Sequence, residues 1–279
     1  MANEAKVAPA QAEKGNGLSS MFASIVIPMC VVVGILIYTF VMGNPSNFEG
    51  NDPNNHPVSE GAGHILGLVY KGGYIVPILL SLVLMTITFS IERFLTISKA
   101  SGKGRAEAFV RKIRVHLQAN NVDAAIKECD IQKGSVANVL RSTLIKYKEM
   151  ETATDMDKEQ KLLAIQKEVE ESTNLELPGL EKNLVVIATM ASVSTLIALL
   201  GTVIGMIKAF SALATAGSPD SVALANGISE ALINTALGIG NSALATIMYS
   251  VFTTKIDYIT FAIDEGGYSI IQTFAEKHK

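Results

Sequence analysis

Charged residues are almost absent from four long stretches of the chain. The stretches cover residues 15–48, 72–91, 183–207 and 221–254. Glu230 is the single Lys, Arg, Asp or Glu within them. A helix of about 20 apolar residues spans the hydrocarbon core of a bilayer, whereas charges interrupt the helices of soluble proteins at short intervals. The pattern therefore predicts an all-α integral membrane protein with about four transmembrane helices.

The ends of these uncharged stretches give the expected boundaries of the transmembrane helices. We predict transmembrane helices at 21–43, 73–97, 183–214 and 222–255. The segments around them are an N-terminal tail (1–20), a linker (44–72), a helical domain (98–182), a short turn (215–221) and a C-terminal tail (256–279). The first run is long for a signal peptide and no Ala-x-Ala site follows it. We therefore expect a retained accessory helix that packs at the periphery and faces lipid.

Basic residues are distributed unevenly around the predicted spans. Ser98–Asn183 holds 15 of the 23 Lys and Arg, whereas the linker Asn44–Lys71 holds one. Since basic residues collect on the cytoplasmic side of a membrane, we expect both termini and the helical domain in the cytoplasm. The linker and the short turn then lie on the periplasmic side. The linker is rich in Gly, Pro, Asn and Asp, which is typical of an exposed connection rather than a folded domain.

The long polar segment carries helical periodicity. One helix face collects five apolar residues, Val136, Val139, Leu140, Leu144 and Tyr147. We expect such helices to form a cytoplasmic domain together with the C-terminal tail. Pro178-Gly179 either kinks the chain before the third span or lies at the bend of one long helix, and the sequence leaves both open.

Composition narrows the classes of function. Only 18% of residues are charged, mean hydropathy is +0.34 and net charge is -3, so no nucleic-acid partner is expected. The chain shows no phosphate-binding loop, no Ser/His/Asp set and no paired-carboxylate signal, so we predict no enzyme, no cofactor and no metal site. Cys30 lies in an apolar run and Cys129 in a charged region, which predicts two reduced thiols and no disulfide.

The third and fourth runs contain many small and hydroxyl-bearing residues. Gly201 and Gly205 form a GxxxG pair, and Gly238 is a candidate packing residue in the next run. The hydroxyls fall into two stripes, each on one helix face: Ser192, Thr195 and Thr202, and then Thr235, Ser242 and Thr246. Two such stripes on consecutive helices predict a polar path. Alternatively, the hydroxyls bond the carbonyls four residues back and contribute only to packing.

Glu230 is the acidic residue of the fourth run. A carboxyl at membrane depth is costly and commonly functional. The alternative is an exposed glutamate near the start of the helix, favoured there by the helix dipole. Lys208, at the far end of the third run, is expected to extend its ammonium to the outer interface.

Three segments carry a resemblance to a known family. Leu199–Phe210 (LLGTVIGMIKAF) resembles the LLGTVxGMIxxF signature of the MotA/TolQ/ExbB proton channel family. Gly227–Gly238 (GISEALINTALG) is similar to the GIxEALxxTAxGL of that family's next helix. Ile91-Glu92-Arg93 matches the ERxxxL at the cytoplasmic end of its first core helix. The order of elements also matches, over about residues 73–260, and the form of the first signature is closest to ExbB.

This resemblance implies a ring-forming subunit of a proton-motive-force-driven motor in the bacterial inner membrane. Proteins of the ExbB type form a homopentamer around two copies of a single-span partner, ExbD, whose membrane aspartate takes up and releases protons. Their motion powers outer-membrane transporters through TonB. Carried over residue by residue, Thr202 and Thr235 are the pore threonines and Glu230 is the membrane glutamate. Thr195, Ser242 and Thr246 extend the predicted proton pathway along the two stripes.

The sequence departs from the family at two positions and leaves two other functions open. Thr195 stands where the family often has proline, and Ala243–Thr246 replaces an AIPA motif, so the helix kinks that those prolines cause are not expected here. A structural membrane scaffold without proton coupling stays an alternative. So does the same kind of motor with another output, such as TolQ-like envelope maintenance, motility or secretion.

Overall fold

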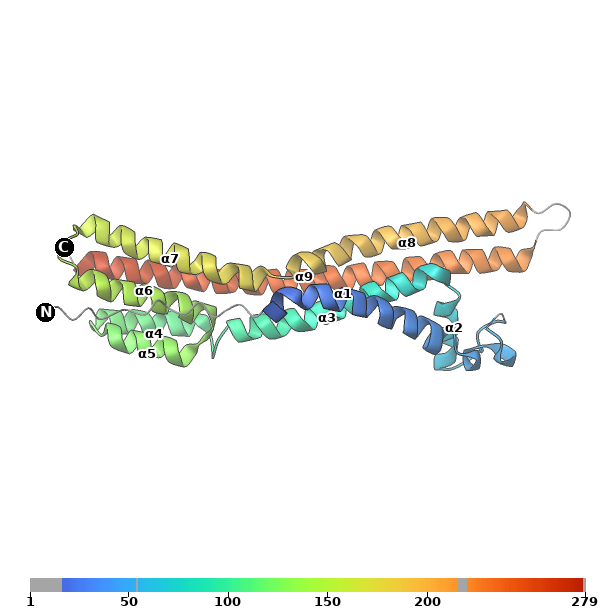
Figure 1. The fold of residues 1–279 in the computed structure, drawn as a ribbon, viewed down its shortest axis with the longest axis horizontal. Coiled ribbons are helices and arrows are strands. Elements are labelled where there is room, and N and C mark those ends of the chain that lie inside the picture. The colour runs from blue at the N-terminus through green and yellow to red at the C-terminus, as the bar shows by residue number, and fades with distance from the viewer. Residues whose placement is uncertain (1–16, 54, 215–219, 278–279) are drawn as a thin grey trace. The chain divides into compact units, whose positions relative to one another are not determined.

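The computed structural model describes residues 17–53, 55–214 and 220–277, and side chains from Phe22 onward. Its helices are α1 (Gly17–Leu36), which continues as a π-helix (Ile37–Met42), α2 (Ala62–Tyr70), α3 (Val76–Ala100), α4 (Ala106–Gln118), α5 (Val122–Gln132), α6 (Gly134–Thr152), α7 (Lys158–Glu181), α8 (Leu184–Leu213) and α9 (Ser221–Lys277) (Figure 1). Over the described residues the structure contains no strand beyond an isolated bridge between Phe48 and Pro57. The all-α prediction is confirmed.

Four helical stretches are long and apolar enough to cross a membrane, as the sequence predicts. They are Phe22–Met42, Gly73–Ala100, Lys158–Leu213 and Ser221–Lys277. One helix end and the position of one bend differ from the sequence pattern. The last helix does not stop near residue 255 but continues through the predicted tail to Lys277. The chain bends at Lys182-Asn183, where Asn183 has a φ of 63°, whereas Pro178 lies inside α7.

The chain folds as two compact units. The first unit contains the described residues up to Thr88 together with Thr189–Leu244, and the second contains Phe89–Ala188 and the residues from Ala245 onward. Helices α3, α8 and α9 therefore contribute residues to both. The predicted site residues of α8 and most of those of α9 fall in the first unit.

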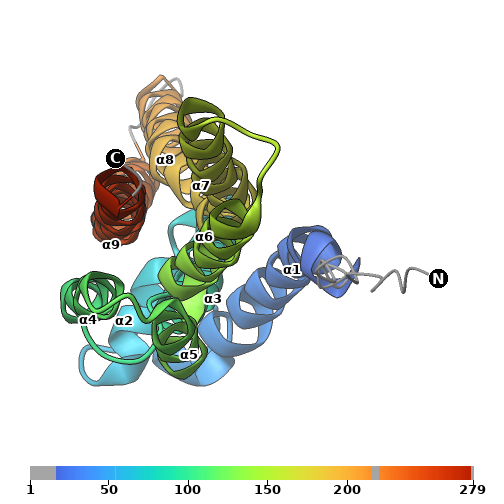
Figure 2. The ribbon, with the colours of Figure 1, turned by 90° about the vertical axis from the view of Figure 1, so that its left-hand side faces the viewer.

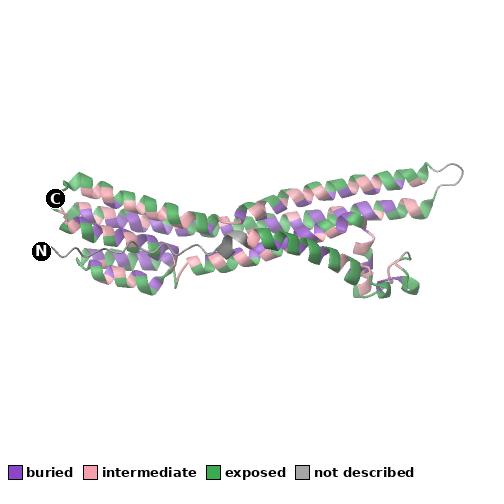
Figure 3. Cartoon of the chain, in the orientation of Figure 1, coloured by how far each residue is buried: buried purple, intermediate pink, exposed green. Residues whose placement is uncertain are grey.

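In the first unit, α8 and α9 pack through small residues. These residues recur three or four positions apart and are all buried: Ser194, Ala198, Gly201, Gly205 and Ala209 on α8, and Gly227, Ala231, Asn234, Gly238 and Asn241 on α9. We call these ten residues the small-residue seam. This spacing keeps one narrow face toward the neighbouring helix, and Figure 3 shows buried positions recurring between exposed ones along both helices. Because the side chains are so small, the two backbones touch.

The glycines of the seam show how close this approach is. A Cβ atom at Gly205 would lie 2.7 Å from the backbone nitrogen of Ala231 and 2.8 Å from the carbonyl oxygen of Gly227. A Cβ atom at Gly238 would lie 2.2 Å from the Cβ of Ala198. A Cβ atom at Gly201 would lie 2.7 Å from the Cβ of Asn234. At Gly201, Gly205 and Gly238 alike, the neighbouring helix therefore leaves no room for a side chain, which is the geometric basis of their predicted packing role.

The first helix and the linker complete the first unit. Helix α1 contacts α3 where a Cβ at Gly34 would meet Ser81, while much of its remaining surface is exposed. The linker is more ordered than its composition indicates, because it contains α2 and buries Phe48. The ring of Tyr70 stacks on Tyr38 at 4.8 Å and meets the edge of Phe48 at 5.5 Å. These aromatic contacts fasten the linker to the end of the first span.

The second unit is a helical bundle of α4, α5, α6, α7 and the C-terminal part of α9, seen end-on in Figure 2. The face of α6 predicted from the sequence is buried, which confirms that prediction. Helix α9 contributes buried residues at the same three- and four-residue spacing as in the seam: Phe252, Ile256, Ile259, Ile263, Gly266, Ile270 and Phe274. Gly266 and Gly267 lie inside this part of α9, where they face Leu140 and Val169.

Arg93 organises the beginning of the second unit. Its side chain is 2% exposed, pairs with Glu92 and donates to the carbonyl oxygens of Gly179 at 3.3 Å and Leu180 at 3.2 Å. Asn183 donates in turn to Glu92 at 3.3 Å. The guanidinium thus satisfies carbonyls in the last turn of α7, which have no helical partner of their own. The Glu92-Arg93 pair of the sequence motif therefore stabilises the C-terminal end of α7.

Both cysteines are free in the structure, and both are buried. Cys30 lies in the first unit and Cys129 in the second. Burial raises the pKa of the Cys129 thiol to about 12. Such a thiol is an inert packing group and not a reactive one.

Candidate functional site

The seam places two threonines of the predicted site against each other. Thr202 follows Gly201 on α8 and Thr235 follows Asn234 on α9, so both lie on the same flank of the helix pair. Their Oγ1 atoms are 2.5 Å apart, and both residues are half-buried. The contact joins residues 33 positions apart in the chain, and it exists because the glycines let the helices approach.

The hydrogen bonds of this pair cannot all form at once. Thr202 Oγ1 lies 3.0 Å from the carbonyl oxygen of Ala198, and Thr235 Oγ1 lies 3.0 Å from that of Ala231. With the bond between the threonines this makes three bonds, but two hydroxyls have only two protons to donate. One threonine therefore donates to the other, whose proton goes to its own carbonyl. The reverse arrangement fits the same atom positions equally well.

The seam repeats this arrangement one heptad away. Thr195 follows Ser194 and Ser242 follows Asn241, and the amide of Asn241 donates to the Ser194 hydroxyl at 2.7 Å. Thr195 and Ser242 therefore occupy the same flank positions as Thr202 and Thr235, displaced by seven residues or about 10 Å of helix. We call these four residues the threonine flank. Thr195 also approaches its own carbonyl partner, that of Ala191, at 3.4 Å.

Two residues of the predicted stripes lie elsewhere. Ser192 is exposed on α8, away from the seam contacts. Thr246 is exposed and belongs to the second unit, so it is not part of this site in the first unit. Thr202 and Thr235 bond backbone carbonyls, as the packing alternative expects, and they also meet across the helices. The polar path stays a prediction.

Glu230 is neither exposed nor alone. Its side chain is 9% exposed, and Lys208 Nζ donates to its two carboxylate oxygens at 2.6 and 2.8 Å. The exposed-glutamate reading of Glu230 is wrong, because its side chain is buried. That Lys208 reaches the outer interface stays a prediction, since its side chain is 46% exposed while its ammonium is paired. The sequence offered no sign of the pairing, since the two residues lie 22 positions apart.

Two buried amides of α9 were not assigned a role from the sequence. Asn234 donates to the carbonyl oxygen of Gly72 at 3.0 Å, and Asn241 donates to Ser194. The signal that could have found them is their place in the seam, where each occupies a position otherwise held by Gly or Ala. The described residues contain no group of three or more His, Cys, Asp or Glu that could hold a metal ion.

A comparison with protein families identifies most of this region. The model of the MotA/TolQ/ExbB proton channel family matches residues 135–265. This part of the chain, residues 135–265, belongs to that family. The matched range contains the whole seam, the threonine flank, Lys208 and Glu230. Members of this family are multi-span transport motor subunits and not enzymes, which agrees with the expectations for this chain.

Curated relatives from this family share parts of the chain. The Tol-Pal system protein TolQ of Haemophilus influenzae is 40% identical over 86 residues, which cover 31% of this chain and 38% of that protein. TolQ of Pseudomonas aeruginosa is 29% identical over 132 residues, 46% of this chain and 57% of that protein. An ExbB-like biopolymer transport protein of Synechocystis sp. is 34% identical over 84 residues, 29% of this chain and 40% of that protein.

The matches cover less than two thirds of each of these relatives. They include two TolQ proteins and one ExbB-like protein, so the expectation that the chain is closest to ExbB is not supported. The comparisons support the MotA/TolQ/ExbB family and do not assign the chain to one of its branches.

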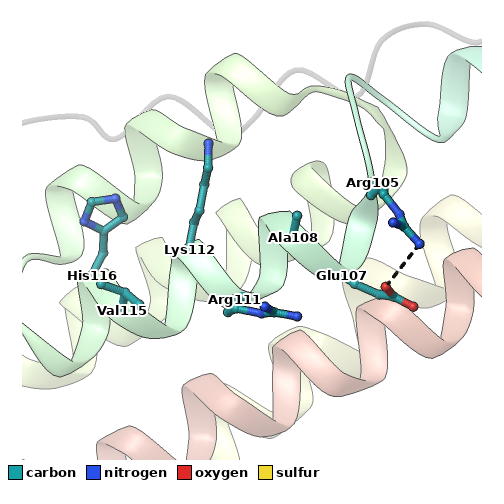
Figure 4. A pocket seen from close by; sticks show the side chains of 7 residues that line it. All are labelled: Arg105, Glu107, Ala108, Arg111, Lys112, Val115 and His116. Carbon is teal, nitrogen blue, oxygen red and sulfur yellow. Dashed lines mark ion pairs between the residues drawn. The ribbon is translucent and has the colours of Figure 1, made fainter.

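One further surface feature lies outside the family match. An open hollow of about 520 Å³ runs along the exposed face of α4 and is lined by Arg105, Glu107, Ala108, Arg111, Lys112, Val115 and His116 (Figure 4). Arg105 pairs with Glu107 at 4.0 Å, and Lys112 pairs with Glu128. None of the predicted site residues lines this hollow. The hollow is basic because it lies in Ser98–Asn183, the segment whose many Lys and Arg residues underlie the predicted topology.

Proposed function

We propose that this chain is a ring-forming subunit of a motor driven by the proton-motive force, in which the threonine flank exchanges hydrogen bonds with a titrating carboxyl of a single-span partner. The observation that carries the proposal is the Thr202–Thr235 contact, with two hydroxyls 2.5 Å apart on one flank of a tightly packed helix pair. Membership of a proton channel family supports it.

The chemistry follows from the two arrangements of the threonine pair. A hydroxyl both donates and accepts hydrogen bonds. The pair can therefore donate to a carboxylate and, after a change of hydroxyl orientation, accept from the protonated acid. A hydrogen bond to a charged group stabilises it by about 1.5–3 kcal/mol, so the hydroxyls lower the cost of an ionised carboxyl at membrane depth. Thr195 and Ser242 offer a second position of the same kind along the flank.

The assembly and its location belong to the same proposal. We infer a homo-oligomer, with five copies around two copies of an ExbD-like or TolR-like partner, in the inner membrane of a bacterium. The uneven distribution of basic residues supports a cytoplasmic location for the helical domain and both termini. The output is transport across the outer membrane through a TonB-like protein, and envelope maintenance of the TolQ kind is the alternative that the TolQ relatives favour.

The test is proton flux in proteoliposomes that contain the chain and its single-span partner. The double variant Thr202→Val with Thr235→Val keeps the side-chain volume but removes both hydroxyl groups, so the pair can neither donate nor accept hydrogen bonds. Losing about 2 kcal/mol of stabilisation for the ionised carboxyl slows flux about 30-fold. Thr254→Val is a matched control, because Thr254 lies on the same helix, is exposed and bonds the carbonyl of Ser250 at 2.9 Å.

Unchanged flux in the double variant, relative to Thr254→Val, would exclude the threonine flank as a proton site. The scaffold alternative makes a different prediction. In that case the double variant loses oligomerisation on native mass measurement, and wild-type vesicles show no partner-dependent flux.

A further inference from the structure

We propose that Lys208 is a fixed counter-charge to Glu230, and that the resulting ion pair positions the Gly72-Gly73 turn against α9 instead of carrying protons. This inference rests on the proposed function for its proton readout. It makes Lys208 a positioning residue, and it removes Glu230 from the proton path that the sequence resemblance implies.

The ion pair is built as a closed contact. Lys208 Nζ donates to Oε1 of Glu230 at 2.6 Å and to Oε2 at 2.8 Å, so both carboxylate oxygens are used. The same ammonium lies 5.1 Å from the ring centre of Tyr74. That cation–π contact comes from the segment that leads into α3, so the lysine joins α8, α9 and the start of α3.

The turn before α3 is shaped to receive this pair. Gly73 has a φ of 77°, and a Cβ atom there would lie 2.4 Å from Oε1 of Glu230. One helical turn further along α9, the amide of Asn234 donates to the carbonyl oxygen of Gly72 at 3.0 Å. Glu230 and Asn234, four residues apart, therefore both hold the Gly72-Gly73 turn. Only glycine combines this backbone angle with so close an approach.

The ion pair and the threonine flank lie on opposite sides of the seam. Glu230 and Lys208 directly precede the seam residues Ala231 and Ala209, whereas the threonines directly follow seam residues. At 100° per residue, Glu230 and Thr235 are about 140° apart around α9. The hydroxyls of Thr202 and Thr235 and the carboxylate of Glu230 therefore face different neighbours.

Protonation would work against this arrangement. A proton carrier alternates between a neutral and a charged form. Protonating Glu230 would break a pairing made by both of its buried oxygens and leave the Lys208 charge without its partner. Among the described residues, the Tyr74 ring also contacts the ammonium, at 5.1 Å from its centre. A tyrosine ring supplies no second positive charge that could replace the ammonium.

The experiment is a double-mutant cycle with two readouts, the apparent melting midpoint of the purified complex and proton flux in proteoliposomes. The variants are Lys208→Met, Glu230→Gln, their combination, the charge swap Lys208→Glu with Glu230→Lys, and Lys208→Arg. Lys255→Met serves as control, because Lys255 is an exposed α9 lysine that contacts an aromatic ring, that of Phe94 at 4.9 Å.

Each single neutral variant should lower the midpoint by roughly 5 °C or more, because it leaves one charge without its partner. The combined neutral variant should recover at least half of that loss, and its flux per folded complex should stay within about twofold of wild type. Lys208→Arg should keep both properties.

Two results would overturn the inference. The first is a flux loss of more than tenfold in Glu230→Gln and in the combined variant at an unchanged midpoint, which would make Glu230 a proton carrier. The second is additive midpoint changes in the cycle, which would show that the two residues are not coupled. If wild-type vesicles conduct no protons, the proposed function fails, while the midpoint cycle still decides whether Lys208 and Glu230 act as a pair.

Discussion

Gly238 is the seam position at which one added carbon atom should destabilise the first unit most. A Cβ at this position would lie 2.2 Å from the Cβ of Ala198 and 2.7 Å from the carbonyl oxygen of Ser194. Ordinary contacts between carbon atoms are about 3.5–4.0 Å. The neighbouring atoms belong to the α8 backbone and to a Cβ, so no side-chain rotation can relieve the clash. Gly238→Ala must therefore push α8 and α9 apart by about 1 Å or more.

The expected magnitude is set by two opposing effects. Overpacking a tight contact costs about 1–3 kcal/mol and occasionally more, whereas replacing glycine by alanine in a helix gains about 1 kcal/mol. Gly240 provides the matched control, because it lies on the same helix and a Cβ there would meet nothing within 4 Å. Both variants receive the same gain in helix propensity. The difference between them isolates the contact, and we expect it to be about 2–3 kcal/mol.

The measurement is the thermal unfolding midpoint of each purified variant in detergent. A difference of this size corresponds to a midpoint roughly 4–12 °C lower for Gly238→Ala than for Gly240→Ala. In the same samples, the Thr202–Thr235 contact should lengthen, which weakens partner-dependent proton flux. Equal midpoints for the two alanine variants would refute the reasoning that backbone contact in the seam holds α8 and α9 together.

Three further predictions concern the second unit. Arg93→Ala should lower its stability by about 3 kcal/mol, because it leaves Glu92 and the last carbonyls of α7 without their partner, and Arg93→Lys should recover only part of this loss in thermal unfolding. The pKa of Cys129 is raised to about 12 from a value near 9, so the folded unit holds a proton that the unfolded chain releases. Its unfolding free energy should therefore fall between pH 9 and 12, by at most about 1.4 kcal/mol per pH unit, and Cys129→Ala should reduce this slope in denaturant titrations. Asp157→Ala should cost about 1 kcal/mol and speed amide exchange in the first turn of α7, whereas Asp157→Asn should not, because Asp157 caps that turn through Gln160 at 2.8 Å.

The membrane spans were predictable because they depend on a simple solvent rule. Uncharged runs of sufficient length imply spanning helices whatever their neighbours are, and all four appear in the structure. The end of the last helix was not predictable in this way. Charges return at Lys255 and Asp257, but a helix that leaves the membrane has no reason to stop there. Gly266 and Gly267 do not end it either, because their missing side chains make room for Leu140 and Val169.

The site was predictable in kind but not in its pairing. The motifs indicate which helices carry the polar residues, and the two stripes contain both members of the Thr202–Thr235 pair. Which residues meet across two antiparallel helices depends on register, and the sequence motifs do not state a register. In the structure the glycine contacts fix it, since Gly201 faces Asn234 and Gly205 faces Ala231. Once that is known, the pairing of Lys208 with Glu230 follows.

The seam also constrains how such a subunit can work. Helices in backbone contact cannot slide past each other without separating, because each small residue fits a gap of its own size. The threonine pair, by contrast, exchanges donor and acceptor by rotating two hydroxyl groups, which moves no backbone atom. If the threonine flank handles protons as proposed, the α8–α9 pair is therefore a rigid wall with switchable hydrogen bonds. Any large displacement must then occur between this wall and the partner helix that carries the titrating carboxyl, and not within the helix pair.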